Sequence, residues 1–205
     1  MVLPALKPVR ATTEGEGQHP LRYRFTVEEF YRMLDAGILT EDDRVELVEG
    51  DIVTMMPIGA RHAYCVDQLT TLFVAQSGGR YVVRVQGPLR VGPTSEVLPD
   101  LMLLQPPPER YREAHPTPED VLLVVEVAET SLTYDREVKV PLYARHGIPE
   151  YWLINLQDNV VEVYRKPSQY GYKEVHYLRS EDTLHPQAVS NVQIPVKTLI
   201  TDDGR

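Results

Sequence analysis

Apolar and polar residues follow helical spacing in three parts of the chain. The stretch TVEEFYRMLDAG places apolar residues three and four positions apart, after a capping box formed by Thr26 and Glu29 and before a closing glycine. A second amphipathic helix is predicted over residues 60–76, before a pair of glycines. A third is predicted from about residue 135 to residue 146, before another glycine.

Runs of strand-forming residues occupy most of the remaining chain. RVELVEGDIVTMM predicts a hairpin with its turn at residues 49–51, and YWLIN with VVEVYR predicts another with its turn at residues 157–159. Further strands are predicted in YVVRVQ, in PLRV, in LMLL at residues 101–104 and in VLLVVEVA at residues 121–128. The segments YKEVHYLR and VQIPV indicate short sheet edges.

Strands interleaved with helices favour an α/β (α+β) fold, in which a mixed central β-sheet is flanked by helices. We expect residues 21–200 to form this fold as a single domain. Residues 1–20 are rich in proline, glycine and charge without any periodicity, which indicates a mobile or irregular arm.

The composition narrows the setting of this fold. The chain has 205 residues, 42% of them hydrophobic, which suits one sizeable core. No apolar run approaches the roughly 18 residues of a membrane span, and the first residues lack the apolar segment of a secretory signal. We therefore expect a cytoplasmic protein with no membrane partner. The single cysteine, Cys65, excludes an internal disulfide and a cysteine-rich zinc motif.

The net charge of −9 weighs against indiscriminate binding to nucleic acid, because phosphate contacts are mostly made by clustered lysine and arginine. It leaves room for a local basic groove. Carboxylates gathered to hold a cation would themselves make the free protein acidic.

One carboxylate stands where the pattern predicts burial. The strand at residues 121–128 is apolar on both faces, so Glu126 has no easy route to water. A buried carboxylate without a partner is penalised by several kcal/mol. If this strand and the strand at residues 101–104 are antiparallel neighbours, Asp100 faces about position 125. Two carboxylates that converge there require either a proton on one of them or a hard divalent cation between them.

Each of these residues also has a simpler explanation. Asp100 follows a proline at the start of a strand, as turn residues do. Glu126 can form a structural salt bridge. Glu46 lies between apolar residues of a hairpin strand, where a solvated side chain is expected, and His62 suits a boundary histidine. Lys139 is a helical lysine of the kind that is usually solvated.

The joint order of several segments is more specific than any single residue. VELVEGDIV, RHAYCVDQL, LPDLMLL, VVEVAETSLTYDREVKVPLYARHGIPEYWLIN and VVEVYR follow one another over about residues 24–165. In this order they resemble the Uma2 family, also called DUF820, of putative restriction endonucleases in the PD-(D/E)XK nuclease superfamily. The resemblance covers most of the chain and is most specific in DREVKVPLYARHGIPEYWLI. It implies a restriction-endonuclease-like core and a metal-dependent DNA endonuclease that hydrolyses phosphodiester bonds.

The resemblance also implies which residues form the site. Pro99-Asp100 matches the Pro-Asp element and Glu126 matches the acidic position on the next strand, so both would bind magnesium, or manganese in its place. The backbone carbonyl of Val127 is a further candidate ligand. Ala128 stands where an E-x-K motif would place a lysine, and the resemblance assigns that role to Lys139 on the following helix.

Roles follow from charge. Asp100 and Glu126 would anchor the metal, and Lys139 would orient a water or stabilise the charge that grows in the transition state. Glu46, which matches an upstream glutamate of the family, would hold water or complete a second metal position. His62 and Gln86 border the site without an assigned step.

DNA is the expected substrate, and relatives that cut both strands as symmetric pairs imply a homodimer. Two alternatives stay open. A nuclease-derived domain that binds nucleic acid or protein without cutting is suggested by the missing E-x-K lysine and the acidic charge. A purely structural ion pair, such as Glu126 with Lys139, is the other.

Overall fold

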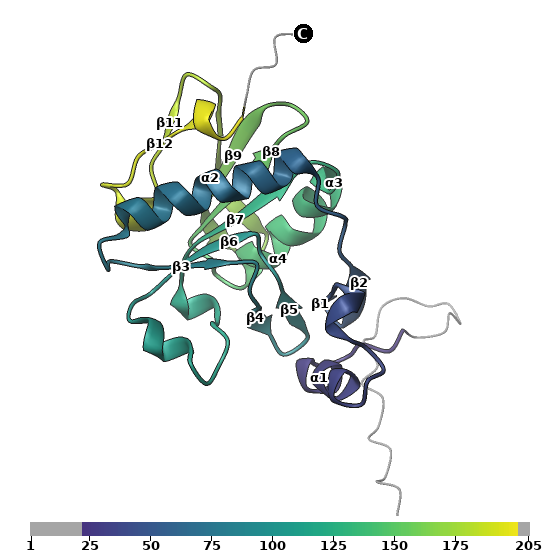
Figure 1. The fold of residues 1–205 in the computed structure, drawn as a ribbon. Coiled ribbons are helices and arrows are strands. Elements are labelled where there is room, and N and C mark those ends of the chain that lie inside the picture. Colours follow the sequence, from purple (N-terminus) through teal and green to yellow (C-terminus); the bar gives the residue numbers. More distant parts are fainter. Residues whose placement is uncertain (1–21, 201–205) are drawn as a thin grey trace, which may run out of the picture.

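The structure is a computed structural model that describes residues 22–200 (Figure 1). The arm predicted for residues 1–20 lies outside the described residues, and the boundary of the domain stays a prediction. The helices are α1 (Val27–Asp35), α2 (Ala60–Ser77), α3 (Leu132–Tyr134) and α4 (Val140–Arg145), with a π-helical segment (Asp135–Lys139) between the last two.

The strands follow one another in the order β1 (Val45–Val48), β2 (Asp51–Thr54), β3 (Val82–Val85), β4 (Leu89–Gly92), β5 (Ser95–Val97), β6 (Leu101–Leu104), β7 (Val121–Ala128), β8 (Glu150–Asn155), β9 (Val160–Ser168), β10 (Gly171–Leu178), β11 (Thr183–Leu184) and β12 (Ile194–Pro195). Short 3-10 turns occur at Glu41–Asp43, Pro108–Tyr111, Pro118–Asp120, Gln187–Val189 and Val196–Thr198.

A six-stranded sheet in the order β10-β9-β8-β7-β6-β3 forms the centre of the fold. β7 and β8 are parallel, whereas every other pair of neighbours in this sheet is antiparallel. The mixed sheet predicted from the sequence is therefore confirmed. β7 lies inside the sheet and seven of its eight residues are buried, as its apolar pattern predicts.

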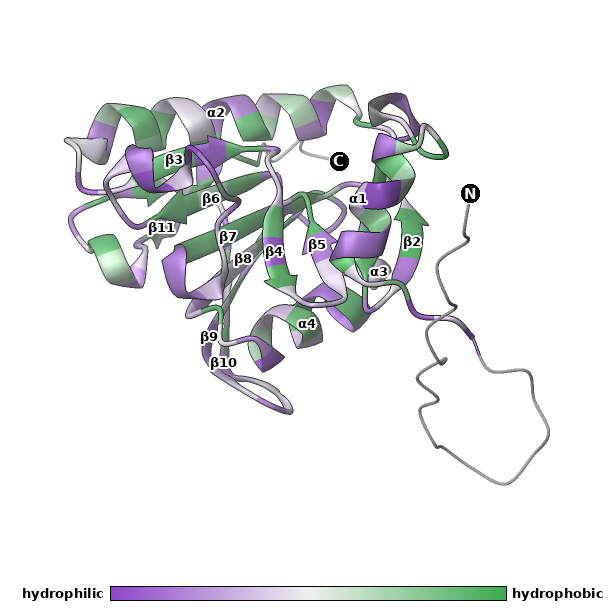
Figure 2. Ribbon diagram, turned by 90° about the horizontal axis from the view of Figure 1, so that it is seen from below, coloured by the Kyte–Doolittle hydropathy of each residue, from purple (hydrophilic) through white to green (hydrophobic). Residues whose placement is uncertain are grey.

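Helices cover both faces of the central sheet (Figures 1 and 2). On one face, α2 packs Cys65, Leu69 and Phe73 into a core with apolar residues of β6, β7 and β8. On the other face, α4 contributes Leu142 and Tyr143 to a second core. The helix predicted over residues 60–76 is thus confirmed, with Gly78 in the left-handed conformation directly after it. Among residues 22–200, no helix is long and apolar enough to cross a membrane.

A four-stranded sheet in the order β2-β1-β5-β4 lies beside the central sheet. β1 and β2 form the predicted hairpin, in which Val48 pairs with Asp51 across the turn. β5 is a strand of three residues that the sequence pattern does not predict, because so short a run carries no visible alternation. Helix α1 begins at the predicted capping box of Thr26 and Glu29.

The third predicted helix differs from its prediction in both start and form. It begins at Leu132 rather than near residue 135, and it widens into the π-helical segment before α4. Pro141 explains the change, because proline has no N–H to donate and its ring crowds the carbonyl four residues back. The N–H of Val140 instead donates to the carbonyl of Asp135, five residues back. The wider turn places both Asp135 and Lys139 on the buried side of the segment.

Candidate active site

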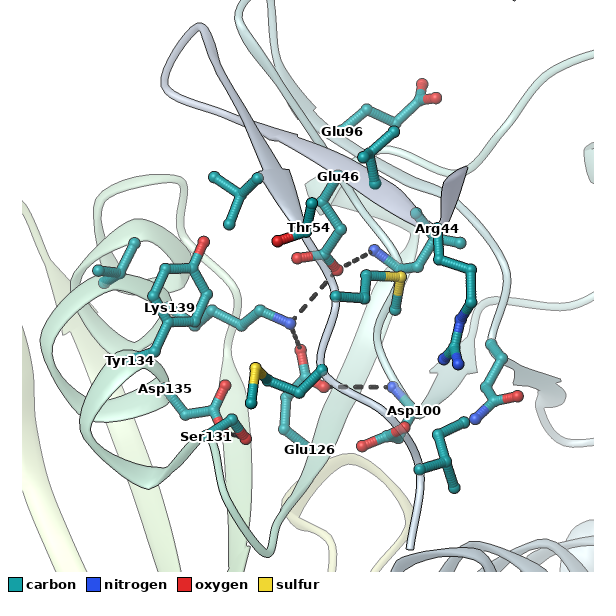
Figure 3. Close-up of a pocket in the computed structure, with 18 of the residues that line it drawn as sticks. Arg44, Glu46, Thr54, Glu96, Asp100, Glu126, Ser131, Tyr134, Asp135 and Lys139 are labelled. Carbon is teal, nitrogen blue, oxygen red and sulfur yellow. Dashed lines mark hydrogen bonds and ion pairs between the residues drawn. The ribbon is translucent and has the colours of Figure 1, made fainter. Parts of the chain in front are cut away.

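β6, which begins directly after Asp100, and β7, which carries Glu126, are antiparallel neighbours, as the sequence predicts. Leu101 pairs with Val125, one residue away from the predicted register, so Asp100 comes beside Glu126 itself. The N–H of Asp100 donates to Oε2 of Glu126 at 3.3 Å, and the N–H of Val127 donates to Oδ2 of Asp100 at 2.9 Å. These reciprocal bonds hold the two carboxylates side by side in the lining of the cavity, whose residues Figure 3 shows.

Lys139 reaches these carboxylates from the π-helical segment. Its Nζ donates to Oε1 of Glu126 at 2.8 Å and to Oε1 of Glu46 at 3.3 Å. The N–H of Leu98 also donates to Glu46, at 2.7 Å. Glu46 is only 3% exposed, so the expectation of a solvated hairpin residue is wrong for it. The lysine therefore joins β1 to β7, and the ion pair with Glu126 that was considered from the sequence is present.

Two other side chains contact the carboxylates, and one backbone N–H contacts the main chain of Asp100. Nε2 of His62, in the first turn of α2, lies 2.8 Å from Oδ1 of Asp100. The hydroxyl of Tyr143 donates to Oε1 of Glu126 at 2.8 Å. The N–H of Gln86 donates to the backbone carbonyl of Asp100 at 3.1 Å, and Gln86 lines the cavity. His62 and Gln86 thus lie beside Asp100, and both line the cavity.

Two residues of the site were missed by the sequence analysis. Asp135 is 3% exposed, lines the cavity and accepts a hydrogen bond from the hydroxyl of Ser131 at 2.6 Å. Tyr134 also lines the cavity, and its buried hydroxyl has no hydrogen-bond partner among the described residues. The spacing of Asp135 and Lys139 was an available signal, because side chains four positions apart share one side of a helix. No comparable signal marks Tyr134.

The cavity has a volume of about 1140 Å³ and two kinds of lining. Its acidic lining residues are Glu46, Glu96, Asp100, Glu126, Glu129, Asp135 and Glu137; its cations are Arg44 and Lys139, and its histidines are His62 and His115. Its aromatic and aliphatic lining residues include Phe30, Tyr31, Leu34, Met55, Met56 and Ile58. The acidic residues outnumber the permanent cations, so an anion entering alone would be repelled.

Burial and charge shift the ionisation of the central pair. Burial raises the pKa of Glu126 to about 8; the ammonium of Lys139 opposes this, and the carboxylates of Asp100, Asp135 and Glu46 add to it. Burial lowers the pKa of Lys139, but Glu126, Glu46 and Asp135 hold it well above its ordinary value. The lysine is therefore charged, and a cation that binds at Glu126 near neutral pH displaces a proton.

The raised pKa of Glu126 predicts a pH-dependent contribution to stability. Because its pKa in the folded protein, about 8, lies above the ordinary value of 4.5, Glu126 stabilises the fold fully below pH 4.5 and loses this contribution as the pH rises through 8. Glutamine resembles the protonated form at every pH. Without metal, the free energy of unfolding of the wild type should therefore fall relative to that of Glu126→Gln across this window.

Urea unfolding of both proteins with EDTA, at about pH 5 and about pH 9, measures this difference. Glu109→Gln changes the same group at an exposed position and serves as the matched control. A difference between the wild type and Glu126→Gln that stays constant over the window would contradict the assignment.

The oxygen atoms at the site are donors of the kind that hard cations such as magnesium prefer. Asp100 and Glu126 supply carboxylate oxygens, and Val127, whose carbonyl is a third candidate donor, also lines the cavity. Among residues 22–200, no group of three or more histidine, cysteine, aspartate or glutamate side chains is arranged to enclose a metal. Magnesium does not need such a cage, because it is usually bound by one or two carboxylates and keeps several waters or substrate phosphate oxygens.

Comparisons with known proteins identify the family of the chain and agree with the fold. Residues 27–197 match the sequence profile of Uma2, described as "Putative restriction endonuclease". A solved structure of a putative nuclease belonging to DUF820, from Anabaena variabilis ATCC 29413, is similar with a TM-score of 0.65 and 20% identity, over 85% of this chain and 97% of that chain. That likeness shows the fold alone.

A structure of the type IIG restriction endonuclease BpuSI matches with a TM-score of 0.37 and 16% identity, over 58% of this chain and 14% of that chain. No curated protein matches this chain.

Proposed function

Because the chain belongs to the Uma2 family of putative restriction endonucleases, we propose that it is a metal-dependent endodeoxyribonuclease that hydrolyses phosphodiester bonds in the cavity described above. The observation that carries this proposal is the convergence of Glu46, Asp100, Glu126 and Lys139, which come from different elements yet line one cavity. A structural ion pair between Glu126 and Lys139 would need neither Asp100 nor Glu46 beside it. The family itself supports a nuclease-like role.

We infer that Asp100, Glu126 and the carbonyl of Val127 hold magnesium, with manganese as a substitute. The acidic lining of the cavity supports this requirement, because a phosphodiester is an anion and needs added positive charge to enter. When bound, the metal polarises a phosphoryl oxygen and lowers the pKa of a bound water. The hydrogen bonds from the N–H groups of Asp100 and Val127 fix the orientation of the two carboxylates before metal or substrate arrives.

Lys139 has the charge and the position to stabilise the reacting phosphate. Its ammonium is held by Glu126 and Glu46, so its place does not depend on the flexible stem of the side chain. A fixed cation in a buried site stabilises negative charge that develops in the transition state, or orients the attacking water. We infer that Glu46 positions the lysine, and that His62 and Tyr143 position Asp100 and Glu126.

The proposal predicts cleavage of DNA that depends on a divalent cation. Supercoiled plasmid, circular single-stranded DNA or both should be nicked or linearised in magnesium or manganese, and EDTA should abolish cleavage because it removes the cation. Agarose gels measure the conversion. Equal cleavage by the wild type and by Asp100→Asn would assign the activity to a contaminating nuclease. Failure to cut either DNA in either metal would contradict the proposal.

A nuclease-derived binding module is the second candidate, and Ala128 in place of the E-x-K lysine is the observation that favours it. Calorimetric titration with manganese, with and without DNA, separates the two. Heat of metal binding that is abolished by Glu126→Ala supports the enzyme. DNA binding with no detectable metal binding supports the module.

We further propose that the protein forms a homodimer, because nucleases commonly act as symmetric pairs. Sedimentation velocity at the concentration of the cleavage assay measures the association. A monomer that cleaves DNA with full activity would contradict it.

A further inference from the structure

The candidate catalytic residues lie deep in their cavity rather than on an open surface. Glu46 is 3% exposed, Glu126 4%, Lys139 6% and Asp100 9%. The cavity's volume of about 1140 Å³ is on the scale of a pocket for a small ligand. A double helix has a major groove that is itself about 12 Å wide, so a whole duplex does not fit into such a space. A phosphate on a thinner ligand therefore reaches these side chains more readily than a phosphate on a duplex.

The same cavity offers apolar contacts next to its acidic part. Met56 is 55% exposed and Ile58 40% exposed, and both line the cavity in the segment between β2 and α2. Tyr31 lines it from α1, but its ring is already stacked with that of His115 at a centroid distance of 6.4 Å. The guanidinium of Arg90 also lies over this ring at 5.7 Å, so Met56 and Ile58 are the exposed apolar contacts. Acidic groups that hold a metal for a phosphate, next to exposed apolar side chains for a base, match the two chemistries of a single nucleotide.

Charge also disfavours a duplex on this protein. The chain carries 21 lysine and arginine residues against 30 aspartate and glutamate residues. Proteins that bind a duplex on their surface depend on extended basic patches that contact many phosphates. Arg44 and Lys139 line the cavity together with seven acidic residues. This arrangement suits one phosphate with its metal, not a long array of phosphates.

Resting on the proposed function, we propose that the substrate is an unpaired strand. The site takes single-stranded or locally unpaired DNA, with the scissile phosphate at Asp100, Glu126 and Lys139 and a neighbouring base against Met56 and Ile58. A base that is already unpaired enters without the free energy of unstacking that a paired base requires. Because the acidic groups are buried in the cavity, the site favours unpaired DNA over a duplex.

The first test compares one labelled oligonucleotide in three forms: single-stranded, as a blunt duplex, and as a duplex with an internal unpaired loop. In manganese, the single strand should be cut at least about tenfold faster than the blunt duplex, and cuts in the third form should fall in the loop. Equal rates on the single strand and the blunt duplex would overturn the inference.

Binding of DNA can be measured independently of its cleavage. Fluorescence anisotropy of the Asp100→Asn protein with the same labelled DNA needs no cleavage. If no form is cut by the wild type, the endonuclease proposal fails, and the anisotropy still decides the inference. Tighter binding of the single strand supports it, and equal or tighter binding of the blunt duplex overturns it.

The apolar contacts are tested by a matched pair of variants. Met56→Ala with Ile58→Ala should weaken binding of the single strand about fivefold, because contact area for the base is lost, and should leave manganese binding unchanged. Ile38→Ala removes the same kind of side chain from a position that is 71% exposed and does not line the cavity. If the double variant binds the single strand as the Ile38→Ala protein does, the assignment of the base contact is wrong.

Discussion

Asp100→Asn should lower the rate of metal-dependent DNA cleavage by about a thousandfold, the size expected when a preorganised charged group of an active site is lost. Asparagine has nearly the same shape, so its carbonyl oxygen can still accept the hydrogen bond that the N–H of Val127 donates to Asp100 at 2.9 Å. What the substitution removes is the negative charge that attracts a divalent cation. Single-turnover rates at saturating manganese measure the loss.

Asp67→Asn is the matched control, because Asp67 is exposed on α2 and the chemical change is the same. Its cleavage rate and its affinity for manganese should equal those of the wild type. Urea unfolding checks that Asp100→Asn is folded. Should the folded variant keep more than about a tenth of the wild-type rate, Asp100 is not a metal ligand.

Lys139→Met should affect both stability and activity. At about pH 9, where Glu126 is ionised, removing one partner of this buried ion pair leaves the other charge uncompensated, which typically costs about 3–5 kcal/mol. Here the side chains left behind are Glu126 and Glu46, which lie 2.8 and 3.3 Å from the lost ammonium. Cleavage should fall about 100-fold to 1000-fold, because the fixed cation near the phosphate is gone. Urea unfolding and single-turnover cleavage measure the two effects.

The double variant Lys139→Met with Glu126→Gln separates a structural role from a catalytic one. It removes both charges of the pair, so it should regain much of the lost stability but none of the lost cleavage. Lys173→Met, at an exposed position of β10, is the control for the loss of a lysine. If Lys139→Met cleaves at the wild-type rate at a temperature where it is folded, Lys139 is structural only.

Elements with a strong local pattern were predicted well. The capping box that begins α1, the glycines that follow α2 and the hairpin of β1 and β2 depend on residues close together in the sequence, so the sequence shows them directly. The antiparallel pairing of β6 with β7 was also predicted. Its register was one residue off, because the long connection between the two strands does not constrain which positions meet.

The predictions from sequence were wrong where the burial of a residue depends on residues far away in the chain. Glu46 has the local pattern of a solvated hairpin residue, yet packing of the hairpin beside β7 buries it against Lys139. The π-helical segment depends on Pro141, but its consequence, the burial of Asp135 beside Lys139, depends on the sheet against which the segment packs. The resemblance to a family, rather than the local pattern, brought Glu46 and Lys139 into the predicted site.

The sequence by itself determined the order of the elements, the burial of β7 and the presence of a carboxylate where water cannot easily reach, because these follow from local periodicity and from the cost of burying charge. Only the tertiary structure decided which groups surround that carboxylate and how deep they lie. Glu46 and Lys139 are 93 positions apart in the chain, and no local rule relates them. Their contact exists because two sheets and a widened helical turn pack around one cavity, and that cavity's depth governs what can reach the charges.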